Sequence, residues 1–354
     1  RRKDAGSGHW FASWFRAGLH CIPLSLPILM MILWRSGDHV TGQTTDWFDW
    51  HAKTQWLLMV LRDRWLAWDV AGAALLYLLL LKGIRDPAIE YSRNLALSAL
   101  FLTAVFLLLP RIVFGSAYAD MRLAPYVIAI AVIAIRPRRT MSLRHAGVLA
   151  VLGLAFFLAR MGGTTISYWM FAHDYRTELA ALEKLPVGAR VVSFVGYSCR
   201  NEWRMSRLEH LPALALERKL AYTNDQWSMA GAQLLTARYT IAGGFAHDPS
   251  QITTTRWCLR EWWRPIGYSM ARFPRDAFDY VWLIRTAPFD PSYASDLVPI
   301  WRSADGTSAL LKVDHTKPAP DIADSELIPK RLLELRDLIR RKRAAEAAAA
   351  EKAK

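Results

Sequence analysis

Apolar residues form long runs in the first half of the chain and shorter, interrupted runs in the second half. Before about residue 168, five mostly apolar stretches stand between polar segments, at about 18–34, 65–81, 95–110, 121–135 and 146–166. A helix that crosses a bilayer needs about 20 such residues. We therefore predict an α-helical polytopic membrane bundle of about five spans, in which Pro23 and Pro27 kink the first span.

The fourth of these spans is short. Its apolar part, from Leu123 to Ile135, would reach only ~20 Å as a helix, whereas the hydrocarbon core is about 30 Å thick. Either the helix extends back through Arg122 and Asp120, or the segment is re-entrant or packed against other helices.

After about Tyr168 the pattern becomes that of a water-soluble domain. A buried strand is predicted at 190–195 after a Pro-x-Gly turn, and another at 280–284. Two further strands flank an Asp-Gly turn within 297–313, which is a strong hairpin signal. We predict a transmembrane domain over 1–167, a small α/β domain over 168–316, and a charged helical or disordered tail over 317–354.

The basic residues also carry information on topology. The net charge is +14, and many Lys and Arg flank the apolar runs or crowd the last ~25 residues, so the charge does not require nucleic acid as a partner. If the N-terminus lies in the cytoplasm, eleven Lys and Arg of the loops and termini fall on the cytoplasmic side and seven on the outer side, and cytoplasmic loops usually carry the excess of these residues. This bias places everything after the fifth span, including the C-terminal domain, outside the cytoplasm.

Seven ionisable residues are predicted near the outer membrane face, and five of them, all except Arg62 and Arg64, are taken as candidates for a site. Charged groups at membrane depth are expensive and are functional candidates by default; these are Asp69, Arg111, Asp120, Arg122 and Arg160. Arginine presents a fork of donors suited to phosphate, which indicates a site for the phosphate of a membrane lipid. The alternative is structural: the arginines extend to headgroups, or the two aspartates pair with arginines and pin neighbouring helices.

The cysteines and the known sequence motifs limit which disulfide, metal and cofactor sites the chain is expected to contain. Cys21 lies in an apolar run, whereas Cys199 and Cys258 fall in the soluble domain and can form a disulfide if that domain is outside the cytoplasm. Whether they pair or stay free is left open. No Cys or His spacing indicates a metal site and no cofactor motif is found, although a divalent metal is not ruled out. Polar residues such as Glu209, His210 and Asp225 are weaker candidates, for which surface and loop roles are favoured.

One short motif supports a resemblance. Arg122-Leu123-Ala124-Pro125 is similar to the Arg-Tyr-x-x-Pro motif that begins late spans in bacterial C-type glycosyltransferases, although it lacks the Tyr and has a shorter spacing. The layout resembles the C-terminal part of those proteins, and equally that of uncharacterised inner-membrane proteins. The resemblance implies a catalytic carboxylate in an early outer loop. Neither Asp69 nor Asp120 matches it, so it is expected upstream of Arg1.

These observations lead to two functional expectations. The first is a glycosyltransferase-like enzyme that uses a polyprenyl-phosphate-linked sugar in envelope glycan assembly, with its catalytic residues unknown. The second is a non-enzymatic membrane scaffold whose periplasmic domain binds a protein partner. Membrane lipid is an expected partner in both cases.

Overall fold

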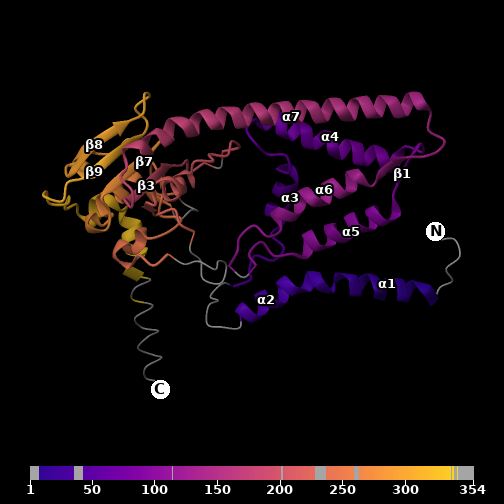
Figure 1. Ribbon diagram of the computed structural model, residues 1–354, viewed down its shortest axis with the longest axis horizontal. Helices are drawn as coiled ribbons and strands as arrows, with labels where there is room; N and C mark the ends of the chain where they lie inside the picture. Colours follow the sequence, from indigo (N-terminus) through magenta and orange to yellow (C-terminus); the bar gives the residue numbers. More distant parts are fainter. Residues whose placement is uncertain are drawn as a thin grey trace, which may run out of the picture. The chain divides into compact units, whose positions relative to one another are not determined.

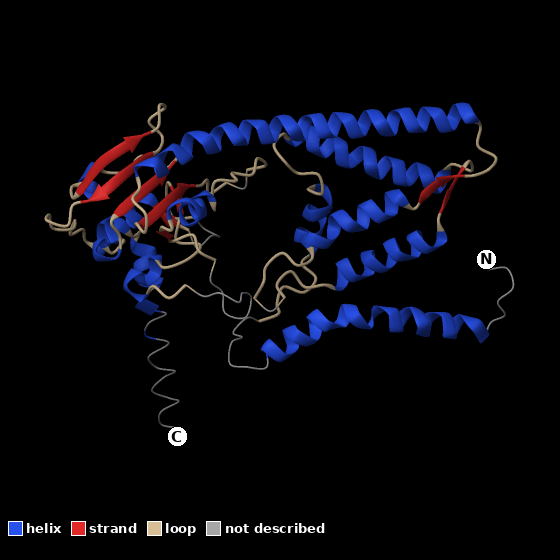
Figure 2. Ribbon diagram, viewed as in Figure 1, coloured by secondary structure: helices blue, strands red, loops and turns tan. Residues whose placement is uncertain are grey.

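The structure is a computed structural model that describes residues 8–35, 43–113, 115–200, 202–227, 237–258, 263–335, 337–338 and 341 (Figures 1 and 2). The chain falls into two compact units. The first is built mainly from Arg1–Leu57 and Arg93–Ala134, and the second from Leu58–Ser92, Ile135–Ser228 and Ala237–Lys354.

The prediction of a five-span bundle is wrong. Within the described residues, only Leu66–Arg85 and Leu143–Lys184 are helices long and apolar enough to cross a membrane. They correspond to the second and fifth predicted spans. The other three predicted spans form shorter helices, and the second unit contains a seven-stranded sheet that a helical bundle would lack.

Backbone chemistry and chain length explain the three shorter helices. The first predicted span is divided into α1 (Gly8–Cys21), the 3-10 turn η1 (Ile22–Ser25) and α2 (Leu26–Arg35), where Pro23 and Pro27 lack the N–H groups that a continuous helix uses. The third and fourth become α5 (Arg93–Leu108) and α6 (Ala124–Ile133). At 1.5 Å per residue these two reach only about 24 and 15 Å.

A buried ion pair organises the first unit. Helix α3 (Trp50–Leu58) carries Lys53, whose Nζ donates to the backbone oxygens of Phe106 and Leu109 at 2.8 Å each and to Oδ2 of Asp120 at 3.1 Å. Lys53 is 2% exposed and Asp120 is fully buried. The ammonium thus satisfies carbonyls at the C-terminal end of α5, where a cation is favoured. Asp120 also accepts from the N–H of Met121 at the start of the 3-10 helix η2 (Met121–Leu123), which leads into α6.

Two long helices run side by side in the second unit. These are α4 (Leu66–Arg85) and α7 (Leu143–Leu179), which continues through the 3-10 helix η3 (Ala180–Lys184) (Figure 1). The Trp68 ring lies against Gly163, and Arg160 lies against Gly72, so the two helices are antiparallel. Short strands β1 (Ile89–Tyr91) and β2 (Ile135–Pro137) pair at the end of α4 remote from the sheet. The predicted boundary at residue 167 falls inside α7, which runs into the sheet domain without a break.

The sheet has the order β6-β5-β3-β7-β9-β8, with β4 also pairing with β3. Strands β3 (Arg190–Gly196), β4 (Tyr222–Thr223), β5 (Ile252–Thr254), β6 (Arg264–Pro265) and β7 (Tyr280–Ile284) form the parallel part. The antiparallel hairpin of β8 (Leu297–Arg302) and β9 (Ala309–Val313) extends it past β7. Strands β3 and β7 are almost continuously buried, as expected of central parallel strands.

Side-chain alternation divides the core into two layers. Val192 and Phe194 of β3 face a cluster that includes helix α9 (Ile266–Arg272), whereas Val191 and Val195 face the end of α7, η3 and α8 (Leu214–Lys219). This period of two places helices on both faces of the sheet. Beyond the sheet, α10 (Asp324–Leu327) is packed through Leu327, and most of the predicted tail after residue 335 lies outside the described residues.

The buried pair in the first unit leads to a stability prediction. Lys53→Met leaves the Asp120 carboxylate buried without its cation, so we expect a loss of roughly 3–5 kcal/mol in unfolding free energy. The double variant Lys53→Met/Asp120→Leu should be more stable than Lys53→Met, because no uncompensated charge remains. The measurement is denaturant unfolding of the detergent-solubilised chain. Lys82→Met, which breaks the exposed pair with Asp86, is the control and should change stability by less than about 1 kcal/mol.

Candidate functional site

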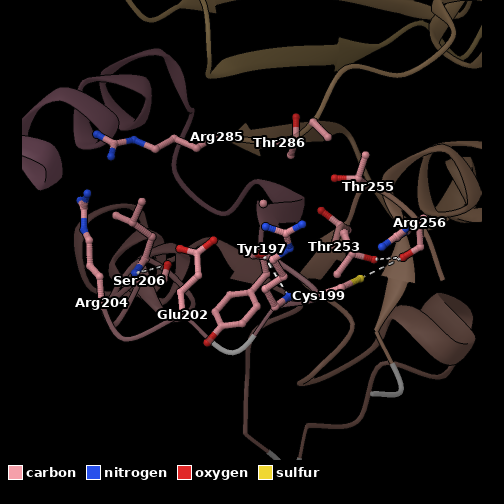
Figure 3. Close-up of a pocket in the computed structure, with 16 residues that line it drawn as sticks. Tyr197, Cys199, Glu202, Arg204, Ser206, Thr253, Thr255, Arg256, Arg285 and Thr286 are labelled. Carbon is pink, nitrogen blue, oxygen red and sulfur yellow. Dashed lines mark hydrogen bonds between the residues drawn. The ribbon is translucent and has the colours of Figure 1, made fainter. Parts of the chain in front are cut away.

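A pocket of about 700 Å³ opens at the carboxyl ends of the parallel strands (Figure 3). After β3 the chain builds β4, β5 and β6 on one side of that strand, and then returns to add β7 on its other side. Ligands of open α/β sheets bind at such a switch point, outside the carboxyl ends of the strands. The pocket is lined by residues that directly follow β3, β5 and β7, so its position follows from the topology.

Gly196 allows two strand ends to approach closely beside the pocket. A Cβ at this position would lie 1.9 Å from the backbone oxygen of Arg285, which no side chain could tolerate. Arg285 itself has a positive φ of 47°, and its N–H donates to the Ser308 hydroxyl at 3.0 Å. The glycine is therefore required by backbone contact, and it brings the loops after β3 and β7 to the same wall.

A disulfide joins the loops after β3 and β5. Cys199 and Cys258 are bonded, with their Cα atoms 5.4 Å apart. Nearby, the Tyr197 and Trp263 rings meet edge to face at 4.6 Å, and the N–H of Tyr197 donates to the backbone oxygen of Thr253 at 2.7 Å. These links hold the two loops together over the end of the sheet.

The pocket lining combines hydroxyl groups with arginine. Among the described lining residues, the only carboxylate belongs to Glu202, and the other polar side chains carry hydroxyl or guanidinium groups. The hydroxyls are those of Tyr197, Ser198, Ser206, Thr253, Thr254, Thr255 and Thr286, and the guanidinium groups are those of Arg200, Arg204, Arg256 and Arg285. Such a set offers many hydrogen bonds and a net positive charge, which suits a hydroxylated anion.

The four arginines differ in their partners. Arg285 contacts the carboxylates of Asp174 at 2.8 Å and Glu178 at 3.2 Å on α7, and Arg204 contacts Asp174 at 3.6 Å. Arg200 and Arg256 are exposed and form no ion pair within the described part of the chain. The uncompensated positive charge of the pocket therefore comes from these two residues, which follow β3 and β5.

The loop after β3 is anchored on the two long helices. The carboxylate of Asp69, which is 1% exposed, accepts from Trp203 Nε1 at 2.9 Å, from Arg160 Nη1 at 3.0 Å and from the N–H of Asp63 at 2.8 Å. Arg62 donates to the backbone oxygens of Trp203 and Glu202 at 2.7 and 2.6 Å. The wall of the pocket that carries Glu202 is thereby attached to the start of α4 and the middle of α7.

The structure places the five predicted membrane-face residues in two groups. Asp69 and Arg160 are paired in the second unit, as in the structural alternative of the sequence analysis. In the first unit, Asp120 is paired with Lys53 and not with an arginine. Arg111 lies 3.8 Å from Asp49 and over the Tyr118 ring, and Arg122 is exposed. None of the five lines the pocket at the sheet edge.

Sequence reasoning missed the pocket residues. The signals were present, since a buried strand ending in Gly196 precedes Tyr197-Ser198-Cys199, and Thr253-Thr254-Thr255-Arg256 forms a polar run. However, β5 is only three residues long and could not be recognised as a strand, so its carboxyl end could not be placed beside that of β3.

Comparisons with known proteins give no assignment. A scan against protein-family models and searches of curated proteins and of solved structures each find no match. Among the described residues, no group of three or more His, Cys, Asp or Glu side chains is arranged to hold a metal ion.

Asp225, a weaker candidate from the sequence, lies in the domain interior near η4 (Leu211–Ala213), away from the pocket lining. It is 2% exposed, and its Oδ1 accepts from the Thr223 hydroxyl while its Oδ2 has no hydrogen-bond partner. Burial raises the pKa of this carboxyl from 3.8 to about 6, against the opposing effects of the Thr223 hydroxyl and His210. The fold therefore favours the protonated form.

This pKa predicts a specific pH dependence of stability. Because the folded pKa is raised, the stabilising contribution of Asp225 is complete below pH 3.8 and is lost as the pH rises through about 6. The difference corresponds to roughly 3 kcal/mol. Relative to the unsubstituted chain, Asp225→Asn should gain about that much unfolding free energy between pH 4 and pH 7. Denaturant unfolding at both pH values tests this, and a difference that does not change with pH would contradict it.

Proposed function

We propose that this chain is a membrane-anchored envelope protein whose α/β domain binds a phosphorylated sugar at the membrane surface. The observation that carries the proposal is the switch-point pocket, where Arg200 and Arg256 stand among hydroxyl side chains and form no ion pair with any described residue. Arginine forks match phosphate oxygens, and the more accessible hydroxyls of Thr255 and Thr286 can exchange hydrogen bonds with sugar hydroxyls. Such a ligand is the headgroup type of the polyprenyl-phosphate-linked sugars that the sequence suggested.

The disulfide and the two long apolar helices support the proposed location. Disulfides persist in oxidising compartments and are rare in the cytosol, and Cys199–Cys258 closes the pocket loops directly. The α7 helix passes from its apolar segment into the domain without interruption. We therefore propose that the pocket lies on the periplasmic side, just beyond the end of a spanning helix.

Glu202 bears on whether binding leads to glycosyl transfer. Among the described residues it is the only carboxylate that lines the pocket, and its side chain lies between those of Tyr197 and Arg204 in the view of Figure 3. A carboxylate can act as a general base toward a sugar hydroxyl. Its substitution therefore separates an enzyme, which would lose turnover, from a binding protein, which would not.

Ligand binding can be tested by neutralising single charges of the pocket. Arg256→Gln should weaken binding of a hexose 1-phosphate about tenfold, the loss expected for one charge-assisted contact. Glu202→Gln should keep or strengthen binding, because it removes a negative charge. The measurement is calorimetric titration of the full chain in detergent, with the neutral hexose for comparison. Arg302→Gln, an exposed change on β8, is the matched control, and equal losses in both arginine variants would contradict the proposal.

The compartment can be tested through the disulfide. In a Cys21→Ser background expressed in bacteria, a membrane-impermeant maleimide should label the chain in spheroplasts only after an impermeant reductant is added. Labelling without reductant would mean that Cys199 and Cys258 are not bonded. Labelling that requires lysis of the inner membrane would place the domain in the cytoplasm and overturn the proposed location.

A further inference from the structure

A second cationic cluster adjoins the pocket, where the two long helices meet the sheet domain. The guanidinium groups of Arg64, Arg204 and Arg207 surround a single aromatic ring, that of Phe171 on α7, at 4.9, 5.7 and 4.8 Å from its centroid. Arg207 also lies 4.4 Å from the Tyr168 ring. Three like charges around one apolar ring repel one another, and nearby anionic groups must offset that repulsion.

The carboxylates in this region do not satisfy Arg64. Arg207 is paired with Asp63 at 2.5 Å, and Arg204 with Asp174 at 3.6 Å. Arg64 forms no ion pair among the described residues, and its Nη1 is buried without a hydrogen-bond partner. Burial and then the neighbouring Arg204 lower the pKa of Arg64, although an arginine stays charged at any physiological pH. A charged donor without an acceptor is costly, and because the Arg64 side chain as a whole is only half-buried, an external anion that reaches it would offset its charge.

An apolar groove begins directly beside this cluster. It is a shallow groove of about 480 Å³ between α4 and α7. It is lined by Trp65, which directly precedes α4, by Trp68 on α4, and by Leu158, Ala159, Gly162, Gly163 and Ile166 on α7. Trp65 follows Arg64 in the chain, and Ile166 precedes Phe171 by five residues, or about 7.5 Å along the helix. The groove therefore leads from the arginine cluster toward the apolar segments of both helices.

The two features fit one kind of molecule. Both helices are apolar enough to cross a membrane, and tryptophans are enriched at the level of lipid headgroups. We infer that this surface is a binding site for a phosphate-bearing membrane lipid, whose phosphate contacts Arg64 and whose hydrocarbon chain occupies the groove. Arg204 also lines the sheet-edge pocket, so the lipid headgroup would lie beside that pocket. The inference does not depend on what the pocket binds.

Two variants test the two halves of this site. Arg64→Gln removes the unpaired charge and should weaken binding of fluorescently labelled phosphatidylglycerol roughly tenfold, without affecting a labelled diacylglycerol that lacks the phosphate. Gly162→Leu should weaken binding of both lipids, because a Cβ at Gly162 meets nothing within 4 Å and the new side chain has room to fill the groove. The measurement is a fluorescence titration of the full chain in neutral detergent.

The chain offers matched controls. Gly153→Leu adds the same side chain to open space on α7 but outside the groove, and Arg144→Gln removes an exposed arginine at the other end of that helix. Both should bind phosphatidylglycerol like the unsubstituted chain. Arg64→Lys keeps the charge and should restore part of the affinity. Arg256→Gln should leave lipid binding unchanged, which separates this site from the pocket.

Two results would overturn the inference. One is unchanged phosphatidylglycerol binding in both Arg64→Gln and Gly162→Leu. The other is full displacement of the lipid by glycerol 3-phosphate together with no effect of Gly162→Leu, because that combination describes a site for a free phosphate and not for a lipid.

Discussion

The second unit depends on the buried carboxylate of Asp69. A carboxylate that is 1% exposed is tolerated only when donors replace the water it has lost. Its donors come from three separate places in the chain: the Asp63 N–H before α4, Arg160 on α7 and Trp203 in the loop after β3. Because one charge requires all three, the helix pair and the pocket loop are held in a single arrangement.

This attachment links the membrane helices to the ligand pocket. The loop that Trp203 anchors also carries Glu202 and Arg204, which line the pocket. Arg204 also contacts Asp174 on α7, so its side chain is held both by its own loop and by that helix. A displacement of α4 relative to α7 would change the Asp69 contacts and thereby move one wall of the pocket. The disulfide ties the first part of the same loop, at Cys199, to the loop after β5, so the part of the pocket wall around Trp203 is the part linked most directly to the helices.

Sequence reasoning found the elements whose signal is contained in one continuous segment. The buried runs of β3 and β7 and the Asp-Gly hairpin of β8 and β9 were recognised with nearly the observed bounds. Strands β4, β5 and β6 are two or three residues long and exist only through pairing with partners distant in sequence. The same limit explains the site, since the pocket is assembled from the ends of three strands. The span count was too high because Pro23 and Pro27 divide the first apolar run, where only a kink was predicted, and because α5 and α6 are too short to cross a bilayer as helices.

The functional candidates predicted from the sequence were mostly arginines. In the structure, the arginines fall into two classes according to whether they contact a carboxylate of the chain. Arg160, Arg207 and Arg285 each meet a carboxylate of the same chain, and their charges serve the fold. Arg64, Arg200 and Arg256 have no such partner among the described residues. Position along the chain does not predict whether an arginine has an internal partner. Arg62 donates to two backbone oxygens, whereas the buried Nη1 of Arg64, two residues later, has no acceptor. A charge without an internal partner is the one that a ligand can satisfy, so the unpaired arginines mark where anions are expected to bind.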